Sequence, residues 1–141
     1  MKEFISNSPE ETEKFASDFA KTLRGGCVIA FEGSMGMGKT HFTRGLARGL
    51  GFKGDVSSPT FAIVNEYRGG VLPIFHFDMY RIVCWEDLDS CGFFDYMEEN
   101  GIIAAEWSEN ISGALPPDTI YITIEKIGEN SRKITINGGG F

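Results

Sequence analysis

The stretch FEGSMGMGKTHF, residues 31–42, constrains the fold of this chain more than any other feature. Gly33 to Thr40 fit the pattern G-x-x-x-x-G-K-[ST], which is typical of loops that bind nucleotide phosphates. Glycines let the backbone turn tightly and approach the phosphates, so that successive N–H groups point at the anion. A helix after the loop adds its positive N-terminus to the site. The motif therefore predicts a strand–loop–helix unit in an α/β fold.

The residues on both sides of the loop meet this requirement. CVIAFEG, residues 27–33, is an apolar run that predicts a buried strand. In residues 38–50 the apolar side chains recur at helical spacing, which predicts a helix with one apolar face. Gly45 and Gly49 in that helix indicate close packing against a neighbour. A second amphipathic helix is expected over residues 8–23, where a Ser-Pro start is followed by acids in the first turn.

Further strands follow in the sequence. FAIVNEY and VLPIFHFD, residues 61–67 and 71–78, are expected to form a hairpin around the turn Arg68-Gly69-Gly70. The tail alternates apolar and polar residues in DTIYITIEKI and SRKITING, which predicts a terminal pair of strands.

A helical region lies between these groups of strands. Residues 85–99 are typical of a helix in two pieces broken near Gly92, and residues 102–107 of a short buried strand. Together the patterns predict an α/β fold: a P-loop NTPase-like sheet of mixed strand direction, flanked by helices. We expect residues 1–141 to form a single compact domain.

Composition narrows the classes of partner and compartment. The net charge of −7 disfavours direct binding to nucleic acid phosphates, which normally requires a basic field. No apolar run approaches the ~18 residues that a membrane span requires, and the acidic N-terminal segment does not resemble an export signal. The three cysteines form no C-x-x-C pair and match no zinc spacing. A reduced, cytoplasmic protein is expected.

The loop and two strand ends carry the candidate chemistry. Lys39 is placed to reach the β- and γ-phosphates, and the Thr40 hydroxyl to bind Mg²⁺. Asp78 and Glu106 each follow an apolar run that predicts a strand. Because acids at the carboxyl ends of such strands lie beside the phosphate loop, either can complete a magnesium site or position a water.

The sequence leaves the roles of several other residues open. DVSSPTF, residues 55–61, fits either a switch segment near the γ-phosphate or a Ser-Pro turn that opens a strand. No N-K-x-D tetrapeptide occurs, which favours ATP over GTP. An arginine that offsets transition-state charge can be any of three: Arg68, Arg81 or Arg132. His41 and His76 are more typical of packing or hydrogen-bonding residues than of ligands.

Five segments in order over nearly the whole chain resemble the TsaE (YjeE) family, the small bacterial ATPases of tRNA threonylcarbamoyladenosine biosynthesis. The segments are SPEET, GSMGMGKTHFTRGL, VSSPTFAIVNEY, HFDMYR and AAEW. The resemblance implies an ATP- and Mg²⁺-dependent ATPase that works with the TsaB and TsaD proteins. These partners transfer the threonylcarbamoyl group, so this chain would contact tRNA only indirectly. Hydrolysis of ATP by the chain alone is expected to be weak, because no obvious internal arginine finger completes the site.

The resemblance also implies roles for individual residues. Glu106 falls on the glutamate of the family's E-W pair and inherits a magnesium or water-positioning role, and Asp78 falls on the aspartate of its H-x-D-x-Y-R segment. Thr40 would bind Mg²⁺ together with Glu106. The positions implied to contact the nucleotide are Thr12, Ser34, Met35, Gly36, Met37, Gly38, Lys39, Thr40, His41, Trp107 and Arg132.

The phosphate loop departs from the family's usual G-D-L-G-A-G-K-T. Ser34, Met35 and Met37 replace the usual residues, and Ser34 removes a negative charge beside the phosphates. His41 stands where a second threonine is usual. We find no physical reason for the two methionines.

Two other functions compete with this one. A small P-loop kinase would use Asp78 as the base on the acceptor, but no segment is large enough for a lid and a substrate domain. A nucleotide-dependent binding module would hydrolyse almost no ATP. Turnover measured with and without acceptors, and with Lys39 and Glu106 replaced, separates these functions.

Overall fold

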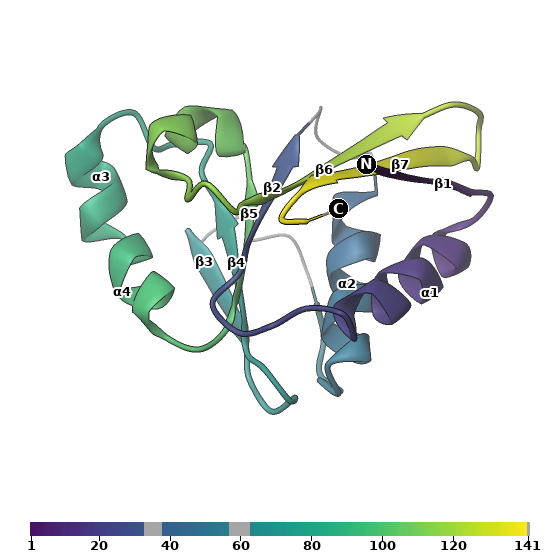
Figure 1. Cartoon of the computed structure of the whole chain (residues 1–141), viewed down its shortest axis with the longest axis horizontal. Coiled ribbons are helices and arrows are strands. Elements are labelled where there is room, and N and C mark those ends of the chain that lie inside the picture. Colours follow the sequence, from purple (N-terminus) through teal and green to yellow (C-terminus); the bar gives the residue numbers. More distant parts are fainter. Residues whose placement is uncertain (33–37, 57–62, 141) are drawn as a thin grey trace.

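The computed structural model describes residues 1–32, 38–56 and 63–140. These residues form one seven-stranded sheet in the order β1-β7-β6-β2-β5-β4-β3, shown in Figure 1. The strands are β1 Lys2–Ser6, β2 Val28–Glu32, β3 Val64–Tyr67, β4 Ile74–Asp78, β5 Ile102–Glu106, β6 Ile120–Lys126 and β7 Arg132–Gly138.

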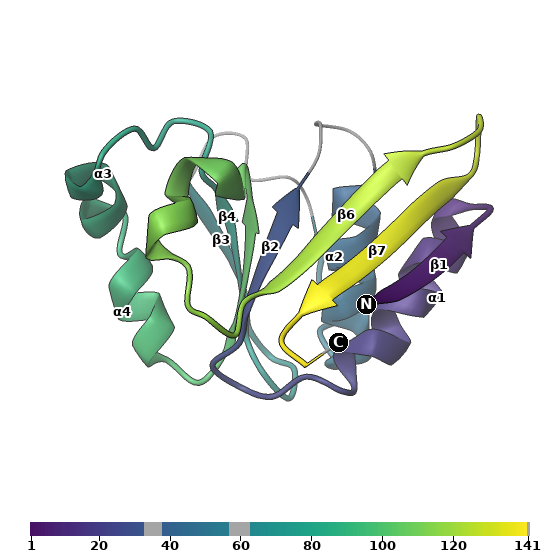
Figure 2. The same cartoon turned by 45° about the horizontal axis from the view of Figure 1, so that its top comes forward.

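Strand direction changes from the middle of the sheet to its edges. The strands β6, β2, β5 and β4 run parallel, whereas β3, β7 and β1 pair antiparallel to their neighbours (Figure 2). The expected sheet of mixed direction is therefore confirmed, as are the β3–β4 hairpin and the β6–β7 pair. β2, the strand that leads into the phosphate loop, lies between β6 and β5 at the centre of the parallel part.

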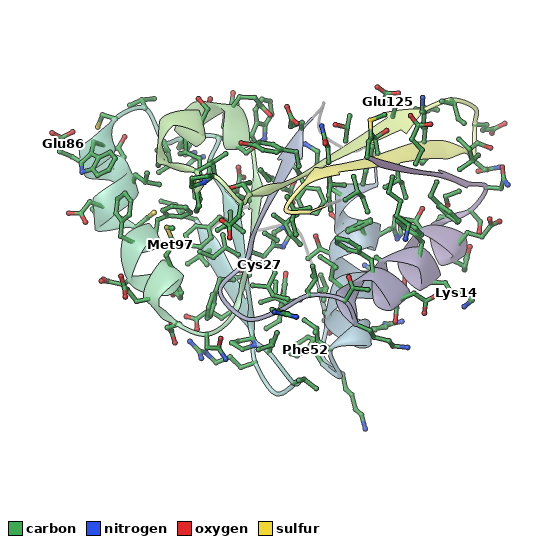
Figure 3. All side chains as sticks on the ribbon, viewed as in Figure 1. Lys14, Cys27, Phe52, Glu86, Met97 and Glu125 are labelled. Atoms are coloured by element: carbon green, nitrogen blue, oxygen red, sulfur yellow. The ribbon has the colours of Figure 1, made fainter. Side chains whose placement is uncertain are left out.

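Helices cover both faces of the sheet. The first face carries α1, Pro9–Ala20, and α2, Lys39–Gly49, whose apolar side chains pack on those of β2 and β6. The opposite face carries α3, Trp85–Ser90, α4, Phe93–Glu98, and the 3-10 helix η1, Ser108–Ala114. Charged side chains such as Lys14, Glu86 and Glu125 are exposed, while Cys27, Phe52 and Met97 pack against the two cores (Figure 3).

The contact between α1 and α2 is made close by glycines. A Cβ atom added at Gly45 would lie 2.3 Å from the carbonyl oxygen of Glu13, and one added at Gly49 would lie 2.4 Å from that of Ser17. No side chain fits at such distances, because the backbone of α1 occupies the space. The close packing expected for these two glycines is confirmed.

Aromatic rings form much of the opposite face. Phe77 of β4 packs against Phe93 at 5.6 Å and against Tyr96 at 5.4 Å between ring centroids, both nearly perpendicular. Edge-to-face geometry of this kind is favoured between aromatic rings. Gly92, with φ 85°, separates α3 from α4, so the expected break in that helix is confirmed.

Some boundaries differ from the sequence expectations. Residues 2–6, for which no element was predicted, form β1 along the edge of β7. The predicted strand 71–78 begins only at Ile74, since Pro73 has no N–H to give to the ladder. Residues 61 and 62 of the other hairpin strand lie outside the described residues. In the part of the chain that the structure describes, no helix is long and apolar enough to cross a membrane.

Candidate functional site

The helix α2 starts at the end of the glycine loop. Gly38 has φ 102° and stands as the N-cap of α2, in a left-handed conformation that favours glycine. Lys39 is next and is buried, with 3% of its surface exposed, and Thr40 is partly buried. Ser34, Met35, Gly36 and Met37 lie outside the described residues. The described end of the loop therefore places Lys39 and Thr40 in the first turn of α2, where the helix dipole favours an anion.

A small pocket adjoins Gly38. Its volume is about 140 Å³, and its lining residues come from three separate parts of the chain: Ser8, Pro9, Thr12, Gly38, His41, Glu129, Asn130 and Arg132. Thr12, His41 and Arg132, three of the positions predicted to contact a nucleotide, are thus brought together. Arg132 donates through Nη1 to the carbonyl oxygen of Ser131 at 3.0 Å.

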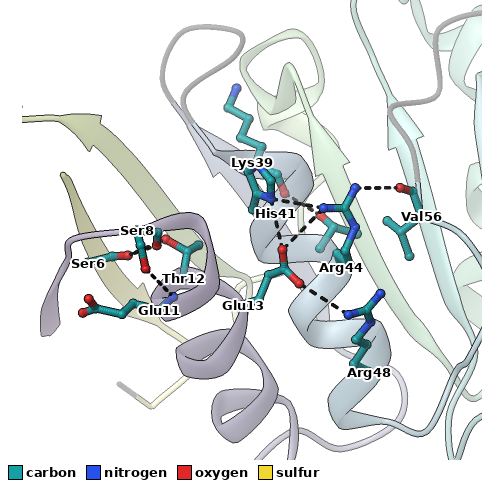
Figure 4. A network of polar contacts seen from close by, with 11 residues as sticks. Ser6, Ser8, Glu11, Thr12, Glu13, Lys39, His41, Arg44, Arg48 and Val56 are labelled. Atoms are coloured by element: carbon teal, nitrogen blue, oxygen red, sulfur yellow. Dashed lines mark hydrogen bonds and ion pairs between the residues drawn. The ribbon is translucent and has the colours of Figure 1, made fainter. Parts of the chain in front are cut away.

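Hydrogen bonds fix the α1 side of this pocket. The Ser8 side chain caps α1 by accepting the Glu11 N–H at 3.1 Å. The Thr12 and Ser6 hydroxyls, both buried, lie 2.7 Å apart. Figure 4 shows these contacts beside the first turn of α2. The close α1–α2 packing described above therefore determines where Thr12 and Ser8 lie relative to Gly38.

His41 belongs to a charged network between the same two helices (Figure 4). Its Nδ1 lies 3.1 Å from Oε2 of Glu13, and Arg44 lies 3.4 Å from the same oxygen. Arg44 also donates to the Val56 carbonyl oxygen at 3.4 Å. The network therefore links α1, α2 and the start of the 55–61 segment, of which residues 57–61 lie outside the described residues.

Asp78 and Glu106 end neighbouring parallel strands. The two residues are Cα partners in the β4–β5 register, and the Met79 N–H donates to the Glu106 carbonyl oxygen at 3.0 Å. Side chains alternate along a strand, so both acids point to the face that carries α2. The sequence predicted that both acids lie at the carboxyl ends of strands, and the structure places them side by side at those ends.

The two acids have different surroundings. The Glu106 side chain is 9% exposed, and its Oε2 lies 2.6 Å from Nε2 of His76. Asp78 is half-buried, and its Oδ1 accepts the Tyr80 N–H at 3.0 Å. Glu106 is therefore held by a buried side chain, whereas Asp78 is held by the backbone turn that follows it.

His76 is itself completely buried. Its second ring nitrogen, Nδ1, lies 3.1 Å from the Tyr67 hydroxyl. The expectation of a hydrogen-bonding histidine is confirmed, but its partners were not foreseen. The signal that was available is its place two residues before Asp78, on the same face of the strand. Only the strand order shows that Glu106 is the neighbour.

Trp107 has an unusual backbone. Its φ of 58° and ψ of 39° are left-handed, and among the described residues no other residue except glycine has a positive φ. Such conformations are costly and gather at functional sites. The Trp107 ring contacts that of Tyr80 at 4.9 Å. Next, the Ser108 hydroxyl donates to the Phe31 carbonyl oxygen at 2.9 Å, which ties η1 to β2.

The three candidate arginines lie in different places. Arg68 is exposed and binds Glu66 and Glu99, with N–O distances of 2.6 and 3.2 Å. Arg81 is exposed on the segment between β4 and α3. Arg132 alone of the three lines the pocket at Gly38.

Several known proteins are similar to this chain in sequence and in fold. The family model described as "Threonylcarbamoyl adenosine biosynthesis protein TsaE" matches residues 6–134. The tRNA threonylcarbamoyladenosine biosynthesis protein TsaE of Bacillus subtilis is 39% identical over 94% of this chain and 83% of its own length. The protein of the same name from Aquifex aeolicus is 39% identical over 96% of both chains. The crystal structure of Bacillus subtilis YdiB has a TM-score of 0.82 at 36% identity, covering 99% of this chain and 86% of that one.

Proposed function

The chain belongs to the TsaE family of tRNA threonylcarbamoyladenosine biosynthesis, and from this premise we propose that it is a Mg²⁺-dependent ATPase working with TsaB and TsaD. The partners carry the tRNA and transfer the threonylcarbamoyl group. A tRNA substrate puts this work in the cytoplasm.

One arrangement supports this proposal above all. The first turn of α2, with buried Lys39, follows a left-handed glycine, and the paired acids Asp78 and Glu106 end the neighbouring strands on the same face. Positive charge and helix N–H groups on one side, with carboxylates on the other, are what phosphoryl transfer to water requires.

The donor atoms fit a magnesium ion. The Thr40 hydroxyl and the Glu106 carboxylate are hard oxygen ligands, of the kind that Mg²⁺ prefers over nitrogen or sulfur. Held by these two residues, the ion would supply positive charge that offsets the charge developing on the phosphates. Lys39 binds the β- and γ-phosphates in this proposal. Asp78 uses Oδ2 to orient the attacking water, since Oδ1 accepts the Tyr80 N–H.

The pocket of Thr12, His41 and Arg132 suits the rest of the nucleotide. It adjoins Gly38, so a nucleotide whose phosphates lie at the start of α2 can extend into it. Hydrolysis by the isolated chain should be weak, because no candidate arginine is assigned to the transferred phosphate. Arg68 is engaged by Glu66 and Glu99, Arg81 is exposed between β4 and α3, and Arg132 lines the pocket proposed for the rest of the nucleotide. The net charge of −7 is compatible with this, because the partners supply the tRNA contact.

The test is ATP hydrolysis by a mixture of this protein with TsaB and TsaD. We expect Lys39→Ala and Glu106→Gln each to lower kcat at least about 100-fold while the variants still fold. Lys53→Ala, at an exposed lysine of the same charge, is the control and should leave turnover unchanged. Unchanged turnover in both site variants would contradict the proposal, and acceptor-dependent ADP release by this chain alone would favour a kinase.

A further inference from the structure

A continuous chain of hydrogen-bonding groups runs through the interior to Glu106. The Tyr67 hydroxyl, the two nitrogens of the His76 ring and Oε2 of Glu106 follow one another at 3.1 and 2.6 Å. The three residues come from the adjacent strands β3, β4 and β5. The function proposed above uses only the last of them.

The hydrogen-bonded series Tyr67–His76–Glu106 is buried among apolar side chains. His76 is 0% exposed and Tyr67 is 5% exposed, in a part of the sheet otherwise built from apolar side chains such as Ile74 and Ala104. An imidazole in such a place costs free energy unless both of its nitrogens are satisfied. An aliphatic residue would fill the same space without this requirement. What distinguishes His76 from such a residue is the pair of hydrogen-bond contacts made by its ring nitrogens.

The hydrogen-bonding capacity of each group determines which atom donates and which accepts in the series Tyr67–His76–Glu106. An ionised carboxylate only accepts, so His76 must donate its Nε2–H to Glu106. In a neutral imidazole the other nitrogen then accepts, and the Tyr67 hydroxyl donates to Nδ1. A distance of 2.6 Å is at the short end for such a bond, as expected when the acceptor is charged.

We propose that His76 is a positioning residue, which holds Oε2 of Glu106 through its Nε2–H and presents the other carboxylate oxygen to the metal and its water. Tyr67 selects the tautomer of His76 that can do so. The inference rests on the proposed function, because it assigns Glu106 the metal role given there. Residues that orient a metal ligand commonly change metal affinity or activity 10- to 100-fold when replaced.

The first test reads the proton positions directly and needs no activity. In a ¹⁵N-histidine spectrum of the whole protein, His76 should show a protonated Nε2 and an unprotonated Nδ1. Tyr67→Phe keeps the ring but removes the hydroxyl, and it should shift the Nδ1 resonance most. A proton on Nδ1 alone, or on both nitrogens, would overturn the proposed donation from Tyr67 to Nδ1.

The second test measures how Mg²⁺ strengthens the binding of a fluorescent ATP analogue. His76→Phe should raise the Mg²⁺ concentration for half-maximal effect about 10-fold and leave binding in EDTA within about twofold. His76→Gln retains an N–H donor and should recover most of the loss. Phe77→Leu, the next residue on β4 but facing the opposite core, is the matched control and should not change the Mg²⁺ requirement.

A double substitution separates positioning from a merely structural role. If His76 acts through Glu106, adding His76→Phe to Glu106→Gln should cause no further change in the Mg²⁺ requirement. Additive effects, or loss of binding in EDTA with no recovery by His76→Gln, would overturn the inference. An unaltered Mg²⁺ requirement in Glu106→Gln itself would instead contradict the proposed function.

Discussion

The two faces of the sheet are assembled in different ways. On the face of α1 and α2, backbone meets backbone at Gly45 and Gly49, and buried polar groups such as Thr12, His76 and Glu106 are hydrogen-bonded. On the face of α3, α4 and η1, rings such as Phe77 and Phe93 meet edge to face. The first kind of contact tolerates little displacement, whereas side-chain packing can adjust to a change of shape.

The face with the closer packing is also the one that carries the candidate site residues. Every described candidate residue for phosphate, metal or nucleotide, apart from Trp107, lies on the α1–α2 face or at the strand ends that point to it. Precise placement is needed where atoms must meet within a few tenths of an ångström. The opposite face needs only to keep the sheet covered. Substitutions on the two faces should therefore differ in whether stability and nucleotide binding change together.

Alanine at Gly45 should have the largest effect. The added Cβ would lie 2.3 Å from the Glu13 carbonyl oxygen, so α1 must move away. We expect a loss of about 2 kcal/mol in the free energy of unfolding, after the better helix propensity of alanine is counted. Nucleotide affinity should fall as well, because Thr12 moves with α1. Denaturant unfolding and nucleotide titration measure the two effects.

Gly113→Ala is the matched control on the other face. A Cβ at Gly113 of η1 would meet nothing within 4 Å. Its stability should stay within about 0.5 kcal/mol of the parent, and its nucleotide affinity should not change. Equal losses at Gly45 and Gly113 would contradict the comparison of the two faces.

Leucine at Phe77 should have an intermediate effect. The substitution removes two edge-to-face contacts from the opposite core but keeps an apolar side chain of similar volume. We expect a loss of about 1 kcal/mol in stability with nucleotide affinity unchanged. A fall in affinity at this position would show that the two faces are coupled through β4.

Among the substitutions expected to lower stability, phenylalanine at Tyr96 should have the smallest effect. The Tyr96 hydroxyl donates to Oε2 of Glu66 at 2.7 Å near the surface, and this bond raises the pKa of Tyr96 to about 12 from 10.0 and lowers that of Glu66. We expect a loss of about 0.5 kcal/mol at neutral pH, since solvent screens the pair.

The sign of its pH dependence follows from linkage. A raised tyrosine pKa stabilises the fold fully below pH 10, and the contribution is lost as the pH rises through 12. The lowered Glu66 pKa adds stability that is lost as the pH falls through the folded-state value. Tyr96→Phe should remove the alkaline component, which thermal unfolding at several pH values would detect. An unchanged alkaline profile would argue against the Tyr96–Glu66 bond.

The sequence predicted those parts of the fold whose signals are local. The strand before the loop, the helix after it, the break at Gly92 and the close contact at Gly45 all depend on residues within one segment. That Asp78 and Glu106 both end strands beside the phosphate loop was predictable from the apolar runs before them, whereas their pairing with one another depends on the strand order.

Pairings across the sheet were not predictable in this way. The β1 edge strand pairs with β7, and His76 meets Glu106, only because of the strand order, which no segment encodes alone. The pocket at Gly38 likewise joins residues 8–12 to residues 129–132. Thr12 and Arg132 were found by family resemblance, since their own residue types carry no signal of proximity.

The central position of β2 has a consequence for how the chain acquires its shape during synthesis. Val28 pairs with Ile103 and Ile29 pairs with Ile120, so both neighbours of the strand that precedes the glycine loop emerge from the ribosome long after it. Contacts of such sequence separation slow folding, because a long loop must close before they form. The sheet around β2 should therefore be completed only after β6 has been translated, late in the synthesis of the chain.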